Sequence, residues 1–457
     1  MSRSDTLLSG SSASPEELIG TALKDLSRSS PAVLRRWLDQ VHTLRGCSQP
    51  VRLVGEKLTL DGRTGEVLSH YSTSAEPHGQ LMVRCKNRRH SRCPACSEEY
   101  RADTFHLIRS GLAGGKGVPE QVAAHPRVLA TLTAPPFGAV HSGLGKDGKP
   151  RTCHPRRTGP ACWRKHKDDD PLIGQPLDPE DYDYVHHVLW NACAGILWRR
   201  FAIYLRRHLA QHAGMTITRF NETVRVSYAK VAEFQKRGVV HFHAVIRLDG
   251  RDPHSPPPPW ASVELLQAAI VSAAAAVRYD LPGYETTLRW GRQVDVRPID
   301  SDLELTEQAV AGYVAKYATK ATETAGGLDK PVRSADLGRL QDLGANPHAA
   351  RLIRTCWQLG DLTRHPAYAE LRLRKWAHML GFRGHFTTKS RTYSTTYGAL
   401  RTARADYRLQ QLGQEHDPET TLVINHWTYA GQGFTPAEAA LAEFTAGPST
   451  QRRSRST

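Results

Sequence analysis

Two short segments contain the side chains of this chain that are best suited to bond-making chemistry. One is His241-Phe242-His243, in a run of residues typical of a β-strand, and the other is Tyr313-Val314-Ala315-Lys316-Tyr317, which is typical of a helix. Successive side chains of a strand point to opposite faces, so the two histidines share one face. Two imidazoles on one face can bind a divalent metal ion, and a tyrosine hydroxyl can attack a phosphodiester.

The strand before the histidines is predicted to pair with them in a hairpin and to supply a third metal ligand. With a three-residue turn at residues 236–238, Glu233 lies opposite His241 on the same face. Gln235 has the same parity and is the second choice. A two-residue turn would place Phe234 there and remove this ligand. A His-x-His pair is also common on an amphipathic surface strand, so the pair alone does not establish a metal site.

The tyrosine segment has a helical spacing that gathers its polar side chains. Tyr313, Lys316, Tyr317 and Lys320 follow an i, i+3, i+4, i+7 pattern and form one face, while the opposite, apolar face is suited to packing on a sheet. A lysine beside a tyrosine favours the phenolate and can neutralise charge at a phosphate under attack. The alternative is a surface helix with two half-buried tyrosines.

The cysteines form a second candidate site. Cys93-Pro94-Ala95-Cys96 has the spacing of a zinc knuckle, and Cys85 and Cys47 complete a predicted tetrahedral structural zinc site. His90 competes for the fourth position, and ordinary buried thiols are the alternative. A further candidate lies in a predicted insertion and consists of Cys153, His154, Cys162 and His166; it is either a weaker site with mixed ligands or a site that has been lost.

Composition favours a protein with a polyanionic partner. The 457 residues carry a formal net charge of +16, which suits phosphate contacts and counterion release, although a general arginine bias would give the same excess. No apolar run approaches the ~20 residues that span a bilayer, and the serine-rich N-terminus has no apolar signal core. We therefore expect a cytoplasmic protein that does not bind membranes.

The C-terminal third is basic and aromatic. Residues 371–408 contain nine Arg or Lys side chains and a single acid, interleaved with aromatic residues. This composition suits backbone contacts and base stacking on single-stranded DNA, and a basic helical domain with an aromatic core is the alternative. The side chains predicted to bind DNA are Arg374, Lys375, Arg383, Lys389 and Arg391.

The order of the predicted elements indicates an α/β (α+β) fold with a central antiparallel sheet covered by helices mainly on one face. The predicted divisions are a disordered N-terminus (1–30), a zinc-binding region (31–120), a nuclease domain (121–335, with an insertion at about 141–181), a helical basic C-terminal domain (336–445) and a disordered tail (446–457).

Three motifs, in this order, resemble the HUH endonucleases of rolling-circle replication, and most of all the replication initiators of actinobacterial plasmids and integrative elements. They are Leu129-Ala130-Thr131-Leu132-Thr133, the His241–His243 strand and the Tyr313–Tyr317 helix. The resemblance extends from about residue 45 to 410 and also includes Cys85, Cys93 and Cys96, the segment Leu189-Trp190-Asn191-Ala192, and residues 376–390.

The resemblance implies a mechanism. His241 and His243 would bind Mg²⁺ or Mn²⁺, and Tyr313 would attack one DNA strand at an origin or hairpin nick site, giving a 5′-phosphotyrosine and a free 3′-OH. Some single-tyrosine relatives carry a glutamate where this chain has Ala309, whereas other initiators use two tyrosines in turn, a role open to Tyr317. The chain has no helicase-type phosphate loop, so a host helicase and polymerase are expected partners.

Two other functions remain open. A relaxase or transposase of the HUH class would use the same chemistry at a transfer origin or a transposon end. A non-catalytic, zinc-containing DNA-binding regulator would not cleave DNA at all.

Overall fold

The computed structural model describes residues 13–27, 30–143, 145, 148–300, 305–320, 322–411 and 420–446. The chain divides into two units, one formed by residues 101–400 and the other by residues 1–100 together with 401–457. The division falls within helices α3 (Pro94–Ala113) and α9 (Tyr397–Gln411).

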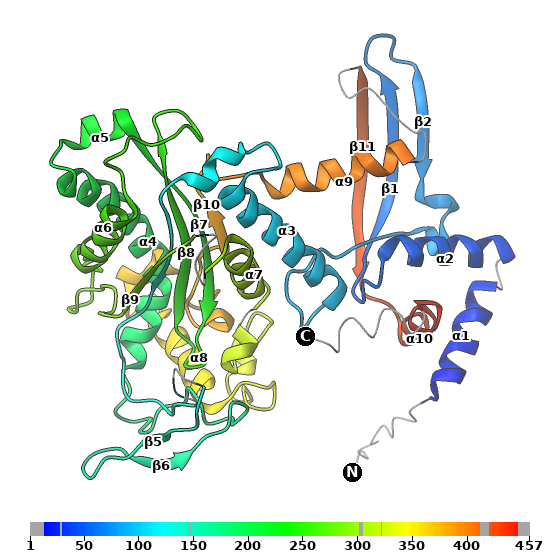
Figure 1. Ribbon diagram of the computed structural model, residues 1–457. Helices are drawn as coiled ribbons and strands as arrows, with labels where there is room; N and C mark the ends of the chain where they lie inside the picture. Colours follow the sequence, from blue (N-terminus) through cyan, green and yellow to red (C-terminus); the bar gives the residue numbers. More distant parts are fainter. Residues whose placement is uncertain are drawn as a thin grey trace, which may run out of the picture. The chain divides into compact units, whose positions relative to one another are not determined.

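The 101–400 unit is built on a five-stranded sheet in the order β10-β7-β8-β4-β9, and every neighbouring pair is antiparallel (Figure 1). Its strands are β4 (Arg127–Leu132), β7 (Val224–Phe234), β8 (Val240–Gly250), β9 (Val294–Pro298) and β10 (Thr387–Lys389). Every residue of β8 except His241 is buried, as expected for a central strand that is covered on both faces.

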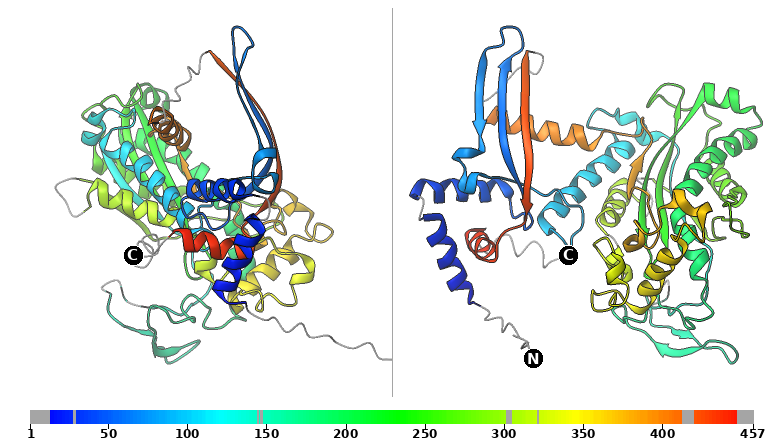
Figure 2. Two further views of the ribbon diagram at one scale, coloured as in Figure 1. Left: turned by 90° about the vertical axis from the view of Figure 1, so that its right-hand side faces the viewer. Right: turned by 180° about the vertical axis from the view of Figure 1, so that it is seen from behind.

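Long helices cover one face of this sheet (Figures 1 and 2). The ring of Phe242 points to this face and lies 5.8 Å from the ring of Trp198. Both side chains belong to one large apolar core, and a fully buried phenylalanine contributes about 2–3 kcal/mol to such a core. After α3, the α-helices of this unit are α4 (Tyr184–His212), α5 (Ile217–Thr223), α6 (Val263–Ala276), α7 (Glu307–Ala318) and α8 (Pro347–Leu359).

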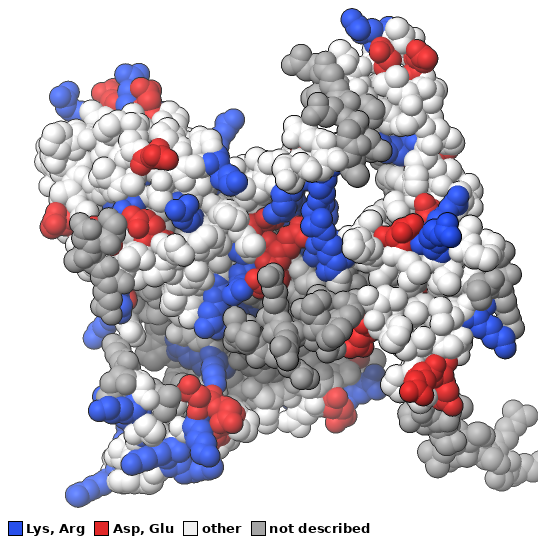
Figure 3. Space-filling view, turned by 45° about the vertical axis from the view of Figure 1, so that its right-hand side comes forward, with Lys and Arg blue, Asp and Glu red and all other residues white. Residues whose placement is uncertain are grey.

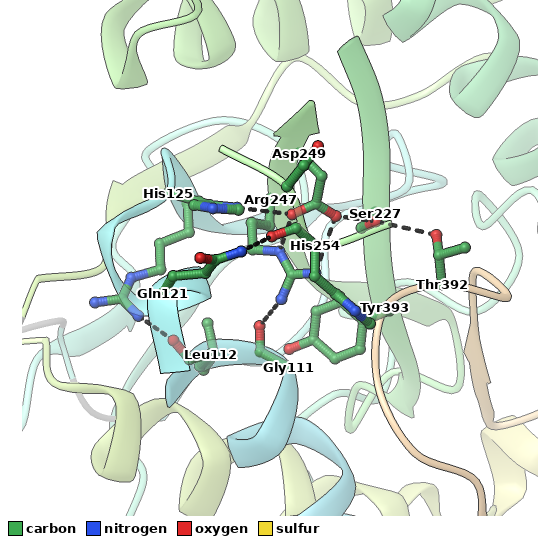
Figure 4. Close-up of polar contacts among 12 residues, drawn as sticks. Gly111, Leu112, Gln121, His125, Ser227, Arg247, Asp249, His254, Thr392 and Tyr393 are labelled. Carbon is green, nitrogen blue, oxygen red and sulfur yellow. Dashed lines mark hydrogen bonds and ion pairs between the residues drawn. The ribbon is translucent and has the colours of Figure 1, made fainter. Parts of the chain in front are cut away.

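The opposite face carries α7 and a buried polar network (Figure 4). Arg247 is fully buried and donates two hydrogen bonds to Asp249, at 2.6 and 2.9 Å, and a further one to the carbonyl of Gly111 in α3. Asp249 also accepts from His125 at 2.8 Å and from Ser227 at 2.6 Å. Because Asp249 accepts hydrogen bonds from Arg247, His125 and Ser227, and Arg247 also reaches Gly111, the network fixes α3 against β7 and β8 despite the cost of burying its charges.

A two-stranded hairpin, β5 (Thr152–His154) and β6 (Cys162–Lys165), belongs to the excursion between β4 and α4. The short 3₁₀ helices of the chain are Thr73–Ala75, Pro77–Gly79, Glu120–Ala124, Thr322–Ala325, Ser334–Asp336, Pro366–Leu371 and Ala377–Met379.

The second unit combines strands from an early and a late segment of the chain in one sheet. Strand β1 (Val51–Asp61) pairs antiparallel with β11 (Thr421–Gln432) over its whole length, and also with β2 (Val67–Ser72) and β3 (Leu81–Val83). A small apolar cluster gathers helices α1 (Pro15–Ser27), α2 (Pro31–Leu44) and α10 (Pro436–Ala446).

These units correct several predicted divisions. Residues 15–27 are not disordered but form α1, because Ala22 and Leu26 are buried in the apolar cluster; residues 1–12 and 447–457 lie outside the described residues. Residues 101–120 belong with the central sheet rather than with the zinc-binding region.

The predicted C-terminal domain (336–445) is not one helical body. Its β10 pairs with β7 of the central sheet, and its β11 pairs with β1. Both pairings join segments distant in the sequence, so local composition could not reveal them. Among the described residues, no helix combines the length and the apolar character that crossing a bilayer requires.

Candidate active site

Three side chains of the β7–β8 hairpin converge on the face that carries α7. The turn is three residues long, and Glu233 pairs with His241, as the sequence predicted. Gly238 makes this turn possible because its φ of +81° is in the left-handed region that glycine favours. The Nε2 atoms of His241 and His243 lie 2.8 and 3.1 Å from the same oxygen of Glu233. Two nitrogens and one carboxylate oxygen form a donor set suited to a divalent cation.

Neighbouring side chains orient both imidazoles. The Nδ1 of His243 lies 3.1 Å from the hydroxyl of Thr131 on β4, and the Nδ1 of His241 lies 3.3 Å from the amide nitrogen of Gln235. The amide of Gln235 thus faces the Nδ1 atom of His241, whereas the shared oxygen of Glu233 faces the Nε2 atoms of both histidines. A hydroxyl can donate or accept a hydrogen bond. Thr131 can therefore hydrogen-bond the Nδ1 of His243 whether or not the Nε2 of His243 binds a metal.

The charges of the group suit metal binding. Burial raises the pKa of Glu233, but hydrogen bonds from His241, His243 and Lys320 outweigh burial and lower this pKa to about 2. Burial lowers the pKa of His243, so its imidazole is neutral near pH 7. An ionised carboxylate and a neutral imidazole are the forms that coordinate metals.

Helix α7 brings both tyrosines to His243. The ring of Tyr313 lies 5.1 Å from the imidazole, and the ring of Tyr317 stacks on it at 5.0 Å. The two tyrosine rings are 4.7 Å apart, and Tyr313 is the more exposed, with 40% of its surface accessible. Burial raises the pKa of both phenols, so both are protonated at neutral pH.

The position of α7 follows from its apolar face and its first turn. Val310 and Val314 are fully buried on the side that packs on the sheet. Thr306 caps the helix by accepting from the backbone nitrogen of Ala309, and Glu307 pairs with Arg127 of β4. A side chain on β4 therefore anchors the beginning of the tyrosine helix.

Lys320, rather than Lys316, reaches the group. The ammonium of Lys320 lies 3.0 Å from Glu233 and 4.4 Å from the centre of the Tyr317 ring. Lys316 is exposed one turn earlier in the chain, and its predicted catalytic role stays a prediction. Helical spacing predicted both lysines on the face of the tyrosines. Which lysine contacts Glu233 depends on how α7 packs on the sheet, and the spacing does not predict this packing.

The four predicted zinc ligands also lie together. The sulfur atoms of Cys47, Cys85, Cys93 and Cys96 all lie within 4.8 Å of one another, and the backbone nitrogen of Cys85 donates to Cys47 at 3.4 Å. His90 is not part of this group. Four sulfur atoms that converge in this way, two of them at the beginning of α3, form a ligand set typical of a structural zinc site.

The predicted DNA-binding side chains lie in two segments. Arg374, Lys375 and Arg383 are exposed in the segment after α8, where Arg374 also covers the ring of Trp357 at 5.3 Å. Lys389 belongs to the edge strand β10, and Arg391 follows it.

A basic surface that composition alone did not single out lies on the β5–β6 hairpin. Residues 148–167 contain seven Lys or Arg side chains and no acid, and Trp163 is 65% exposed among them. Figure 3 shows Lys and Arg side chains gathered at the lower left of the view, where the hairpin lies. Exposed cations around an exposed indole suit contacts with nucleic acid.

Comparisons with known proteins agree with one another. A family model described as "RepSA: Replication initiator protein, pSAM2" matches residues 33–447. A curated protein from Streptomyces ambofaciens, described as "Replication initiator protein", is 48% identical over 450 residues, which cover 94% of each chain. No solved structure matches the chain significantly.

Proposed function

The chain belongs to the RepSA family of replication initiator proteins, and we propose that it starts rolling-circle replication by nicking one DNA strand at an origin. The observation that carries this proposal is the convergence of Glu233, His241 and His243 beside Tyr313, on one face of an antiparallel sheet. A metal site next to a partly exposed tyrosine, in a strongly basic protein, suits the chemistry of an HUH endonuclease.

In the proposed reaction, the hydroxyl of Tyr313 attacks the scissile phosphorus. The bond from the tyrosine oxygen to phosphorus forms, the bond from phosphorus to the 3′ oxygen breaks, and the phenol proton ends on that 3′ oxygen. The products are a 5′-phosphotyrosine and a 3′-OH that can prime synthesis. Because one phosphoester bond replaces another and no water takes part, the energy of the phosphodiester is retained for rejoining.

Glu233, His241 and His243 would hold the Mg²⁺ or Mn²⁺ ion. When bound, the ion would polarise the scissile phosphate and stabilise the charge that develops on its oxygens. Lys320 pairs with Glu233, and its ammonium lies over the Tyr317 ring. This positive charge would stabilise the negative charge of a phosphate bound beside the tyrosines.

Tyr317 is proposed to act in rejoining. It lies one turn after Tyr313 on α7, and its ring stacks on His243, so both phenols border the same metal group. The position four residues before Tyr313 is the exposed Ala309, which cannot activate a water molecule. In place of a water molecule activated by glutamate, Tyr317 would attack the DNA in the rejoining step.

Origin DNA is the proposed partner. Arg374, Lys375, Arg383, Lys389 and Arg391 are proposed to contact its phosphates, together with the basic β5–β6 hairpin. A host helicase and polymerase would unwind and copy the nicked template in the cytoplasm.

The proposal is tested with a labelled single-stranded oligonucleotide that carries the origin, incubated with the wild-type protein and Mn²⁺. We expect a cleaved product and a protein band shifted by covalently bound DNA. Absence of both would favour a non-catalytic DNA-binding regulator. A nick that maps only to a transfer origin or a transposon end would instead identify a relaxase or transposase.

Replacing Thr131 by valine is expected to weaken Mn²⁺ binding by roughly 10- to 100-fold, the usual effect of removing an outer partner of a metal-binding histidine. Valine keeps the shape of threonine but leaves the Nδ1 of His243 without its 3.1 Å partner. The Mn²⁺ concentration for half-maximal nicking measures the effect. Thr388→Val on β10 is the matched control; equal Mn²⁺ requirements in both variants would contradict a role for Thr131.

The cysteine cluster is proposed to bind a structural zinc ion. Cys93→Ser is expected to lose one zinc ion per chain and to lower the melting temperature of the β1–β11 unit. The physical reason is that metal binding contributes to the folding free energy of a unit with a small apolar cluster. Elemental analysis and thermal unfolding measure both effects, with Cys193→Ser as a control thiol in the other unit. Unchanged zinc content in Cys93→Ser would contradict the assignment.

A further inference from the structure

The excursion between β4 and α4 contains a second group of possible metal ligands. His141, Cys153, Cys162 and His166 each direct one donor atom to a common point, and these four atoms lie within 4.8 Å of one another. The Nε2 of His166 lies 3.2 Å from the Nδ1 of His141 and 3.4 Å from the sulfur of Cys162. The sulfur of Cys153 lies 3.8 Å from the same Nδ1. Two sulfurs and two imidazole nitrogens are a donor set typical of structural zinc.

An outer partner fixes the histidine at the centre of this group. The Nδ1 of His166 lies 2.7 Å from a carboxylate oxygen of Asp170, so the ring presents Nε2 to the other ligands. The side chain of His166 is fully buried, although its neighbours in the chain are exposed. Carboxylate, imidazole and metal in line are a recurrent arrangement in zinc proteins.

The sulfur of Cys153 also has the environment of a thiolate ligand. It accepts hydrogen bonds from the backbone nitrogen of Ser142 at 3.2 Å and from the hydroxyl of the same residue at 3.6 Å. Cys153 and Cys162 are both free, so no disulfide accounts for their proximity. Such donors lower the cost of a buried negative sulfur.

The hairpin has little else to hold it together. Between residues 150 and 168 the buried side chains are Cys153, Cys162 and His166, whereas Trp163 is exposed. A hairpin of two short strands without an apolar core is not stable in water unless it is cross-linked. A bound metal would supply that cross-link.

We propose that His141, Cys153, Cys162 and His166 bind a second structural Zn²⁺ ion, separate from the four-cysteine site. The ion closes the excursion at its base, where His141 exchanges backbone hydrogen bonds with Gln175 and Gly174 at 2.8 and 2.9 Å. Zinc therefore joins the hairpin to the two chain segments that connect it to the rest of the unit.

The closed excursion lies against the turn of the β7–β8 hairpin. The ammonium of Lys236 donates to the carbonyl of Asp168 at 2.5 Å. A Cβ at Gly174 would lie 2.4 Å from the carbonyl carbon of Lys236, so the two backbones are in direct contact. Because this turn sets the register of Glu233 and His241, loss of the second zinc would loosen the support of the proposed catalytic group.

The test counts zinc ions in the full-length protein by native mass spectrometry and elemental analysis. We expect two Zn²⁺ per wild-type chain, one in Cys162→Ser or Cys93→Ser, and none in the double variant. One zinc in the wild type that disappears with Cys93→Ser would overturn the proposal. Two zinc ions in Cys162→Ser would overturn it as well.

A pair of histidine variants tests the ligand assignment. His141→Asn is expected to retain one zinc and His154→Asn two, because His154 follows Cys153 but is not part of the four-atom group. The reverse result would overturn the assignment of His141.

Asp170→Asn provides a variant that keeps all four ligands and avoids a failure to fold. We expect a chelator to remove the second zinc ion from this variant at a chelator concentration roughly 10- to 100-fold lower than the wild type requires. Equal resistance to the chelator would contradict the proposed outer partner. Tyr313→Phe is expected to retain both ions, so the zinc count stands or fails independently of DNA nicking.

Discussion

Tyr313→Phe is expected to abolish the covalent adduct between the protein and a single-stranded origin oligonucleotide. Removing one oxygen deletes the proposed nucleophile and leaves the ring that packs 5.1 Å from His243. The rate of adduct formation should fall by at least about 10³-fold, as when other covalent enzymes lose their nucleophile. Denaturing gel electrophoresis of a 5′-phosphotyrosine product, with DNA labelled on the 3′ side of the nick, measures the effect.

Tyr317→Phe is the matched control because it removes the same atom one turn away on the same helix. This variant is expected to form the first adduct within about tenfold of the wild-type rate, because it keeps the ring that stacks on His243 and a barrier change of about 1 kcal/mol alters a rate less than tenfold. It should fail to transfer that adduct to a second strand. Adduct formation by Tyr313→Phe but not by Tyr317→Phe would move the nucleophile to Tyr317. Normal adduct formation by both variants and by the double variant would exclude α7 as its source.

His241→Ala is expected to lose Mn²⁺-dependent nicking by at least about 100-fold while its affinity for origin DNA stays within about threefold of wild type. His241 is the only residue of β8 that is not buried, so alanine removes a ligand without opening a cavity in the core. Glu233 keeps its contacts with His243 and Lys320. Loss of activity would therefore reflect loss of metal binding rather than loss of the folded structure.

Two measurements separate these effects. Fluorescence anisotropy with the labelled oligonucleotide gives the DNA affinity, and a Mn²⁺ titration of nicking gives the metal requirement. His212→Ala, at the exposed end of α4, is the control for replacing a histidine elsewhere. If His241→Ala nicks DNA with the Mn²⁺ requirement of the control, the hairpin group does not hold the catalytic metal.

Local spacing was enough to predict the geometry of the hairpin and of the four cysteines. The register of Glu233 on His241 follows from strand periodicity and a turn that ends in glycine, and it is confirmed. The grouping of Cys47 with Cys85, Cys93 and Cys96 is confirmed as well. In each case a short motif already fixes most of the geometry, so little depends on how distant segments pack.

Contacts between distant segments were not predictable in the same way. Thr131 contacts His243 from β4, and Lys320 contacts Glu233 from the residues after α7; no periodicity within either segment identifies these partners. His154 was predicted as a ligand because it is adjacent to Cys153. The Nδ1 of His154 lies 3.1 Å from the sulfur of Cys153, but the four donor atoms that meet are those of Cys153, Cys162, His166 and His141, which joins them because the excursion closes on itself.

The pairing of β1 with β11 has a consequence for synthesis of the protein. Residues 101–400 form one unbroken stretch of chain, so a ribosome has delivered every strand of the central sheet before β11 exists. The partner of β1 emerges about 360 residues after β1 itself, and bringing together ends so far apart is slow. Translation thus delivers the strands of the proposed nicking centre first and β11 later, and β1 is an open sheet edge until β11 has emerged.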